Sequence, residues 1–101
     1  MKTIINEIDG KLVAIFEGEL DTAAAVEAEN ELKPLYDNED KDILIDCEKL
    51  EYIASSGLRI LLSILKKAKS HGHTVILKGL NDEIKNVFKM TGFINLFDFE
   101  N

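Results

Sequence analysis

A continuous apolar run followed by a strongly amphipathic stretch constrains the fold more than any other feature of this sequence. Residues 43–45 are all apolar, which is typical of a strand covered on at least one face. Farther along, apolar side chains recur on one helical face: Leu58, Leu61, Leu62, Leu65 and Ala68. This spacing predicts a helix over 56–71, ended by Gly72, because glycine readily takes the left-handed conformation that follows many helices.

The segments that follow continue the alternation of strand and helix. Residues 74–77 are predicted to form a strand, 82–90 a helix ended by Gly92, and 96–99 a short last strand. Strands separated by helices become parallel neighbours joined by right-handed crossovers. The second half of the chain therefore predicts an α/β fold with parallel strands.

The first half opens differently, with two apolar runs, 3–8 and 12–16, separated by Asp9-Gly10. An Asp-Gly pair between two such runs predicts a hairpin, because glycine accepts the positive φ of a tight primed turn. We expect residues 18–22 to break the second strand. An antiparallel hairpin added to parallel strands makes the predicted sheet mixed.

A helix is predicted after this break, capped by Asp21 or Thr22. Its inward positions are Ala25, Ala28, Leu32, Leu35 and Tyr36. Pro34 should kink or end the regular hydrogen bonding near Lys33, because proline has no N–H to donate and its ring clashes with the preceding turn. The polar residues 37–42 form a surface connection.

Size and charge restrict the class of protein. With 101 residues and 46% apolar content, we expect one domain over 1–101. The single cysteine, Cys47, cannot form an internal disulfide, and no apolar run reaches the length of a membrane span, so a cytoplasmic location is expected. The formal net charge of -7 disfavours nucleic acid and anionic membranes and favours a protein partner with a basic patch.

Ser55 and Ser56 lie at the amino end of the predicted helix 56–71, which makes them the main candidates for function. Backbone N–H groups there have no partner inside the helix. A serine hydroxyl can cap such an end, and a phosphate there would gain from the same N–H groups and from the positive end of the helix dipole. Both roles remain open on local sequence alone.

The chain resembles the STAS family, the sulfate-transporter and anti-sigma-factor-antagonist domain. The order and spacing of five segments carry the resemblance: the hairpin, Gly18-Glu19-Leu20-Asp21, Ile43-Leu44-Ile45-Asp46 before a central loop, Ser55-Ser56-Gly57-Leu58, and Met90-Thr91-Gly92-Phe93. The resemblance implies a STAS-like mixed sheet with the helices packed mainly on one face. It implies a regulator of transcription and not an enzyme.

In stand-alone bacterial members, an anti-sigma factor that is also a kinase phosphorylates the serine directly before the Gly-Leu pair, which here is Ser56. Ser55 is the second candidate. The resemblance implies a partner switch: the unphosphorylated domain binds the anti-sigma factor and frees a sigma factor, phosphorylation releases it, and a phosphatase restores it. The implied partner-binding residues are Asp21, Ser55, Gly57, Leu58 and Arg59.

Two of these positions have a second interpretation, and a neighbouring position departs from the family pattern. Many family members carry an aspartate two places before the phosphorylated serine, where this chain has Ala54, so kinase recognition or the electrostatics of a phosphate can differ. Arg59 can steady a phosphate or an acidic group on the partner, or be an ordinary solvated arginine. Asp21 can contact a partner or simply cap the first helix.

The sequence offers little for catalysis, cofactors or metals. A serine nucleophile needs a base within hydrogen-bond reach, and His71 should lie roughly 22 Å from Ser56 along the same helix. His71 and His73 have no evident third ligand for a zinc site, and no glycine-rich phosphate loop is present. We expect Cys47 to be a buried apolar filler and Asp46 a polar residue at a strand end.

A second function remains open: a STAS subunit that binds without phosphorylation, such as a cytoplasmic accessory of a lipid or anion transporter. Ala54 favours this alternative, because the loop differs from the family's commonest form. The apolar tail, 93–99, either completes the core or leaves a patch for a partner.

Overall fold

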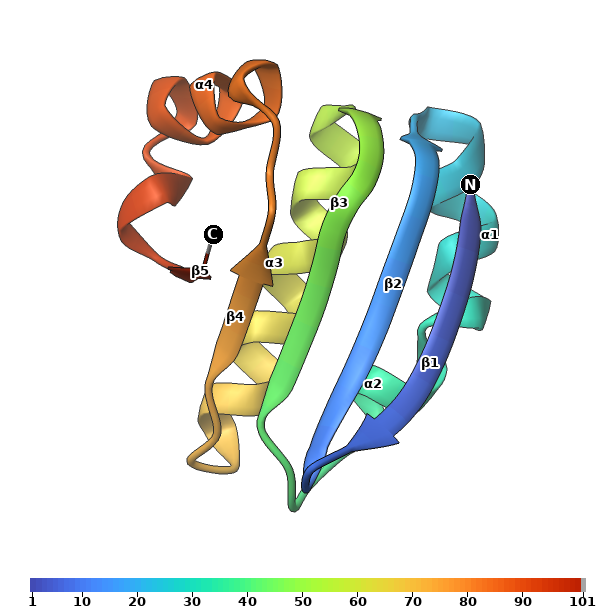
Figure 1. Cartoon of the computed structure of the whole chain (residues 1–101), viewed down its shortest axis with the longest axis vertical. Coiled ribbons are helices and arrows are strands. Elements are labelled where there is room, and N and C mark those ends of the chain that lie inside the picture. The colour runs from blue at the N-terminus through green and yellow to red at the C-terminus, as the bar shows by residue number, and fades with distance from the viewer. Residues whose placement is uncertain (101) are drawn as a thin grey trace.

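The computed structural model describes residues 1–100 and contains a five-stranded sheet in the order β1-β2-β3-β4-β5 (Figure 1). β1 and β2 pair antiparallel, and every other neighbouring pair is parallel. In chain order the elements are β1 (Lys2–Ile8), β2 (Lys11–Leu20), α1 (Thr22–Glu31), α2 (Lys33–Tyr36), β3 (Ile43–Ile53), α3 (Ser55–Ser70), β4 (Val75–Lys78), α4 (Asp82–Thr91), the 3-10 turn η1 (Phe93–Asn95) and β5 (Asp98–Glu100). The predicted mixed α/β sheet is confirmed.

The opening hairpin turns at Asp9 and Gly10, whose φ angles are 52° and 78°. Positive φ at both central residues is the requirement of a type I′ turn, whose twist matches the flanking strands. The predicted break of the second strand at residue 18 is wrong. Gly18 instead takes a φ of 100° inside β2, beside a shift of register with β3, and the strand continues through this bulge to Leu20.

The first predicted helix is divided in two, as Pro34 requires. α1 ends at Glu31, and the short α2 begins at Lys33 with the proline in its first turn, where no N–H is needed. Leu32 joins the two helices, and its N–H still donates to the carbonyl of Ala28 at 2.8 Å. The predicted stripe is buried except Tyr36, which is half-buried.

β3 is longer than the sequence analysis predicted, and the expected central loop after Asp46 does not exist. The strand runs on to Ile53 because Leu50 and Ile53 continue its buried face while charged residues occupy the other. Its last pairing partner is Leu20, at the end of β2. Only Ala54 separates β3 from α3, so the two serines lie directly at the edge of the sheet where β2 and β3 end.

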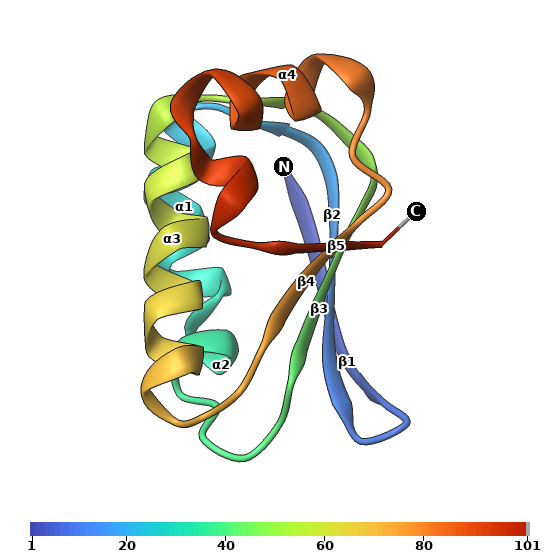
Figure 2. The same ribbon diagram turned by 90° about the vertical axis from the view of Figure 1, so that its left-hand side faces the viewer.

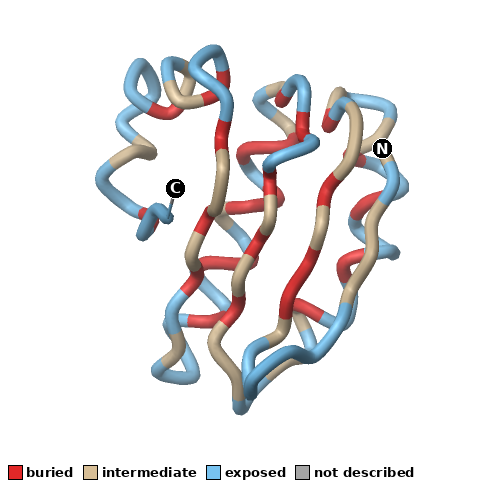
Figure 3. The backbone as a smooth tube through the Cα atoms, viewed as in Figure 1, coloured by how far each residue is buried: buried red, intermediate tan, exposed pale blue. Residues whose placement is uncertain are grey.

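The helices α1, α2 and α3 cover one face of the sheet, and α4 lies across the end where β3 terminates (Figures 1 and 2). The core lies between this helical layer and the sheet, where buried positions recur along β3 and α3 (Figure 3). Its largest fully buried side chains include Phe16, Leu20, Ile45, Leu61 and Phe88. The predicted packing of helices mainly on one face is confirmed.

The apolar tail does both things that the sequence left open. Phe97 is 6% exposed and its ring packs edge-on against Phe88, with the ring centroids 5.8 Å apart. Leu96 and Phe99 remain 43% and 38% exposed. The tail therefore completes the core through Phe97 and leaves two apolar side chains at the surface.

Candidate functional site

The two serines are the first two residues of α3, and neither caps the helix. Ala54 occupies the cap position in an extended conformation, and within residues 1–100 no side chain accepts a hydrogen bond at this end. The N–H of Ala54 donates to the carbonyl of Leu20 at 2.9 Å, which ties the start of α3 to the end of β2. The capping role that the sequence left open for Ser55 and Ser56 is therefore wrong, and the first N–H groups of α3 have no side-chain acceptor among the residues that the structure describes.

Gly57 and Leu58 fix the start of α3, and with it the two serines, from the side of the core. A Cβ atom on Gly57 would lie 2.7 Å from Cγ of Leu20 and 2.9 Å from Cγ1 of Ile53, closer than real side chains approach. Leu58 is 4% exposed and belongs to the core. The structure thus places these two predicted partner-binding residues beneath the surface, where they position the serines.

The two serine hydroxyls differ in access. Ser55 is exposed, whereas Ser56 is half-buried and its Oγ exposes less than 1 Å² and has no hydrogen-bond partner within residues 1–100. A rotation about the Cα–Cβ bond to another staggered position would be needed to turn this oxygen outward. The hydroxyl of Ser56 is thus buried and unpaired in this conformation, and its exposure to an enzyme requires a change of rotamer.

Ser56 lines a groove of about 280 Å³ between α3 and the pair α1 and α2. The groove residues are Thr22, Ala25, Val26, Glu29, Tyr36, Ser56, Arg59, Ile60 and Ser63. Arg59 is the one cation among them and stands three residues after Ser56, a spacing that places two side chains side by side on a helix. The structure therefore brings together Ser56 and Arg59, two of the predicted site residues.

The α1 and α2 side of this groove was missed by the sequence analysis. Val26 is 70% exposed and lies outside the predicted apolar stripe of its helix, which is the feature that could have revealed it. Tyr36 packs partly against the core, as expected, and also borders the groove. Burial, followed by the charge of Glu29, raises the pKa of the Tyr36 phenol, so this residue stays neutral.

Asp21 caps α1 and does not line the serine groove. Its Oδ1 accepts a hydrogen bond from the N–H of Ala24 at 2.8 Å, which confirms the predicted cap. The side chain borders a separate hollow of about 290 Å³, together with Glu19 and Glu27. Contact between Asp21 and a partner stays a prediction, and its surroundings are acidic.

The STAS domain family model matches residues 2–101. This chain belongs to the STAS family. Its relatives include BtrV of Bordetella bronchiseptica, whose name assigns it provisionally as an anti-sigma factor antagonist; it is 32% identical over 101 residues, which cover 100% of this chain and 87% of BtrV. The anti-sigma-B factor antagonist of Staphylococcus aureus is 30% identical over 79 residues, covering 78% of this chain and 73% of that protein.

A solved structure has the same fold. The anti-sigma factor antagonist SpoIIAA of Bacillus, in its unphosphorylated form, superimposes with a TM-score of 0.75 at 17% identity, covering 99% of this chain and 88% of SpoIIAA. Its phosphorylated form gives a TM-score of 0.74 at 18% identity, with coverage of 99% and 92%. These values confirm the STAS-like fold that the sequence predicted.

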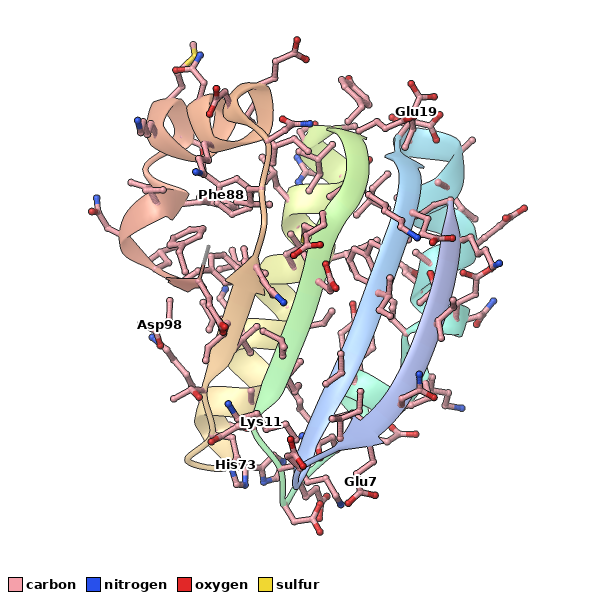
Figure 4. All side chains as sticks on the ribbon, viewed as in Figure 1. Glu7, Lys11, Glu19, His73, Phe88 and Asp98 are labelled. Atoms are coloured by element: carbon pink, nitrogen blue, oxygen red, sulfur yellow. The ribbon has the colours of Figure 1, made fainter. Side chains whose placement is uncertain are left out.

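Both histidines of this STAS domain lie at the far end of α3 from the serines. His71 is the residue that ends the helix. His73 places its Nδ1 3.2 Å from Oδ1 of Asp42 and its Nε2 3.0 Å from the carbonyl oxygen of Glu39, and Figure 4 shows it at the opposite end of the molecule from Glu19. These contacts tie the loop after α2 to the start of β4, away from the serine groove.

The carboxylate of Asp42 links the loop after α2 to Thr74, directly before β4. Its Oδ1 accepts a hydrogen bond from the N–H of Thr74 at 3.0 Å. This bond, followed by the contact with His73, holds the pKa of Asp42 below its usual value. Among residues 1–100, no three His, Cys, Asp or Glu side chains come together as a metal site.

The other groups that the sequence singled out have structural positions. Cys47 is buried in β3, and burial, followed by the charge of Asp46, raises its pKa to about 12. The prediction that Asp46 ends a strand is wrong, because β3 continues past it and its Oδ1 accepts from the N–H of Glu48 at 3.0 Å. None of the helices formed by residues 1–100 has the length and apolar character to cross a membrane.

A third hollow, of about 530 Å³, lies at the opposite end of the sheet from the serines. It is bounded by Glu7 and Leu12 of the hairpin and by residues 37–41. Its lining holds carboxylates, one amide and one lysine, and it contains neither serine, cysteine nor histidine. This hollow is larger than the serine groove, but its lining residues do not include a nucleophile paired with a base.

Proposed function

We propose that this STAS domain is a cytoplasmic anti-sigma factor antagonist that works by partner switching. In its unphosphorylated form it binds an anti-sigma factor that is also a serine kinase. Phosphorylation of Ser56 releases the complex, and a phosphatase restores binding. The observation that carries the proposal is the position of Ser56 at the uncapped amino end of α3, in a chain whose relatives are named for this role.

The proposed transfer is simple in chemical terms. Oγ of Ser56 attacks the γ-phosphorus of ATP held by the kinase, the new O–P bond forms, and the bond from that phosphorus to ADP breaks. The hydroxyl proton passes to a base of the kinase. This domain supplies only the acceptor, so its own role is binding and not catalysis. It needs no cofactor of its own.

One phosphate is enough to act as a switch. A phosphoserine adds about -1.5 to -2 charge near neutral pH, three or more hydrogen-bond acceptors and a strong demand for solvation. An uncompensated charge in a tight interface costs about 3–5 kcal/mol, and each 1.4 kcal/mol is roughly a tenfold change in affinity. Binding would therefore weaken by about two to four orders of magnitude.

The surface around Ser56 suits a protein partner. Ser55 and Arg59 are exposed beside it, and we call these three residues the docking surface. Gly57 and Leu58 support that surface from inside, and Asp21 offers a second, acidic contact at the start of α1. SpoIIAA has been solved with and without its phosphate, and both forms have the fold of this chain, which supports a switch that leaves the fold in place.

One observation favours the second function, a STAS binding subunit that is never phosphorylated and serves a transporter. The hydroxyl of Ser56 is buried and unpaired, so an enzyme reaches it only after a change of rotamer. In that alternative Ser56 is a packing residue, and the groove binds its partner in a single state. The two functions differ in one measurable property, the transfer of phosphate to Ser56.

The deciding experiment incubates the purified domain with its anti-sigma factor and ATP and maps phosphate by mass spectrometry. Ser55→Ala and Ser56→Ala are the matched variants. We expect phosphate on the wild type and on Ser55→Ala, none on Ser56→Ala, and loss of the complex as phosphate accumulates. Phosphate on Ser55 alone would overturn the assignment of the acceptor. A stable complex without phosphate on either serine would overturn the switch and show that binding does not depend on phosphorylation.

A further inference from the structure

We infer that Arg59 is the internal counter-ion of a phosphate on Ser56, so that phosphorylation draws the guanidinium into the groove and away from a partner. This inference rests on the proposed function, because it concerns the regulation of the same site. Phosphorylation would then change the docking surface in two ways: it adds negative charge, and it withdraws the cation of Arg59.

The first support is the placement of the two side chains. Ser56 and Arg59 both line the groove between α3 and α1 with α2, and they are three residues apart on one helix. The guanidinium carries five N–H donors in a planar fork that matches phosphate oxygens. If the side chain of Ser56 rotates toward the groove, a phosphate on its Oγ would lie next to the guanidinium of Arg59.

The second support is that both groups are available. Arg59 is exposed and its guanidinium forms no salt bridge within the part of the chain that the structure describes. Oγ of Ser56 has no hydrogen-bond partner among the same residues. Because Ala54 offers no side-chain acceptor, the first N–H groups of α3 are also open to an anion. A phosphate would therefore meet donors on two sides without breaking an existing pair.

The remaining groups of the groove set the balance of charge. Glu29, on α1, is the one carboxylate among the lining residues, and it repels a phosphate. Tyr36, on α2, stays neutral because its pKa is raised by burial and by Glu29. Arg59 and the amino end of α3, in contrast to Glu29, attract a phosphate. Since a phosphate dianion carries more charge than the single carboxylate, Arg59 pairs with the phosphate once it is present.

This ion pair makes the docking surface different in the unphosphorylated and phosphorylated forms. Without phosphate, Arg59 extends into solvent and is free to meet an acidic group of the partner. With phosphate, the guanidinium is held against Ser56 and that contact is lost. Phosphorylation of one residue thus removes a cation from the surface and adds an anion beside it.

The test installs the phosphate without any kinase, by incorporating phosphoserine at position 56 during translation. The pH midpoint of the phosphate ³¹P resonance is then measured in the otherwise wild-type chain and in Arg59→Gln, Lys66→Gln and Glu29→Gln. Lys66→Gln is the matched control, because it removes the same charge from an exposed position of α3 outside the groove. Far-ultraviolet circular dichroism checks that each variant keeps its fold.

We expect Arg59→Gln to raise the midpoint by about 0.5 pH unit, because a nearby cation favours the dianion and the open groove weakens the effect. Glu29→Gln should lower it, and Lys66→Gln should leave it within about 0.1 unit, since ten residues of helix span roughly 15 Å, beyond the screening length. Equal midpoints for Arg59→Gln and the parent, or an equal rise in Lys66→Gln, would overturn the inference. Failure of a kinase to modify Ser56 would overturn the proposed function instead and leave this result unaffected.

Discussion

Gly57 packs against Leu20 at a distance that admits no side chain: a Cβ atom on the glycine would lie 2.7 Å from Cγ of the leucine. Leu20 is fully buried at the end of β2, so it has little room to move. The contact fixes the start of α3 against the edge of the sheet. The positions of Ser55 and Ser56 depend on it, because they are the two residues before the glycine.

Gly57→Ala is therefore expected to destabilise the domain. Alanine normally stabilises a helix by about 1 kcal/mol relative to glycine, but the forced contact with Leu20 should reverse the sign and cost about 1–3 kcal/mol. Urea unfolding measures the free energy of unfolding. Gly57→Val, with a larger side chain, should cost more, and a stabilising effect of Gly57→Ala would show that the contact relaxes freely.

Ser56→Ala is expected to stabilise the domain, by about 1 kcal/mol. A buried hydroxyl without a partner costs about 1–3 kcal/mol, and alanine is also the better helix former. Ser55→Ala is the control, since an exposed substitution of this kind stays within about 0.5 kcal/mol. If Ser56 capped the helix, its removal would instead destabilise by about 0.5–2 kcal/mol, so the sign of the change in urea unfolding decides between the two roles.

Ala54→Asp is expected to raise the free energy of unfolding by about 0.5–2 kcal/mol at pH 7, because the carboxylate supplies the acceptor that the amino end of α3 lacks. Ala54→Leu, which adds no acceptor, is the matched variant and should give no such gain. Thermal unfolding at low protein concentration measures both. An absence of stabilisation by Asp would mean that these N–H groups are already satisfied.

Asp21 can be tested for its two roles separately. Asp21→Ala removes the acceptor from Ala24 and should cost about 0.5–2 kcal/mol of stability. Asp21→Asn keeps an oxygen acceptor and removes the charge, so it should leave stability within about 0.5 kcal/mol. Titration with the anti-sigma factor then measures the partner contact. Weaker binding by Asp21→Asn at unchanged stability supports a charged contact, and unchanged binding limits Asp21 to its role as a cap.

We expect the contacts of Asp42 to make the domain less stable in acid. Its pKa is lower in the folded chain, chiefly because of the N–H of Thr74, so its stabilising contribution is present above the unfolded value near pH 4. The contribution is lost as the pH falls through the folded pKa. Urea unfolding between pH 7 and pH 2 should therefore show a smaller acid loss in Asp42→Asn than in the wild type. Asp37→Asn, an exposed change in the same loop, is the control, and equal acid losses in wild type and Asp42→Asn would contradict the prediction.

Local pattern was sufficient for the elements that bury one face. The hairpin followed from Asp9-Gly10 between two apolar runs, and α3 followed from a 3.6-residue apolar period that the structure buries at Leu58, Leu61 and Leu65. Pro34 marked the division between α1 and α2 because its ring is incompatible with a helix interior. These features depend on residues near one another in the chain.

The errors arose where distant segments decide the outcome. The local sequence around Gly18 predicts the end of a strand. In the structure, pairing with β3 keeps β2 extended past this residue, which forms a bulge. The second half of β3 looks like a polar loop, yet Leu50 and Ile53 pack into the core and keep it extended. Pairing and burial supply the free energy that overrides these local preferences.

The sequence by itself determined the family, the mixed α/β sheet and the location of the two serines at the start of an amphipathic helix, because period, turn chemistry and residue order are local properties. Only the tertiary structure decided that Ala54 and not a serine occupies the cap position, that Gly57 lies against Leu20, and that the hydroxyl of Ser56 is buried beside Arg59 in a groove walled by α1 and α2. Burial and distance across a groove depend on how separate elements pack, and the linear order of residues does not specify them.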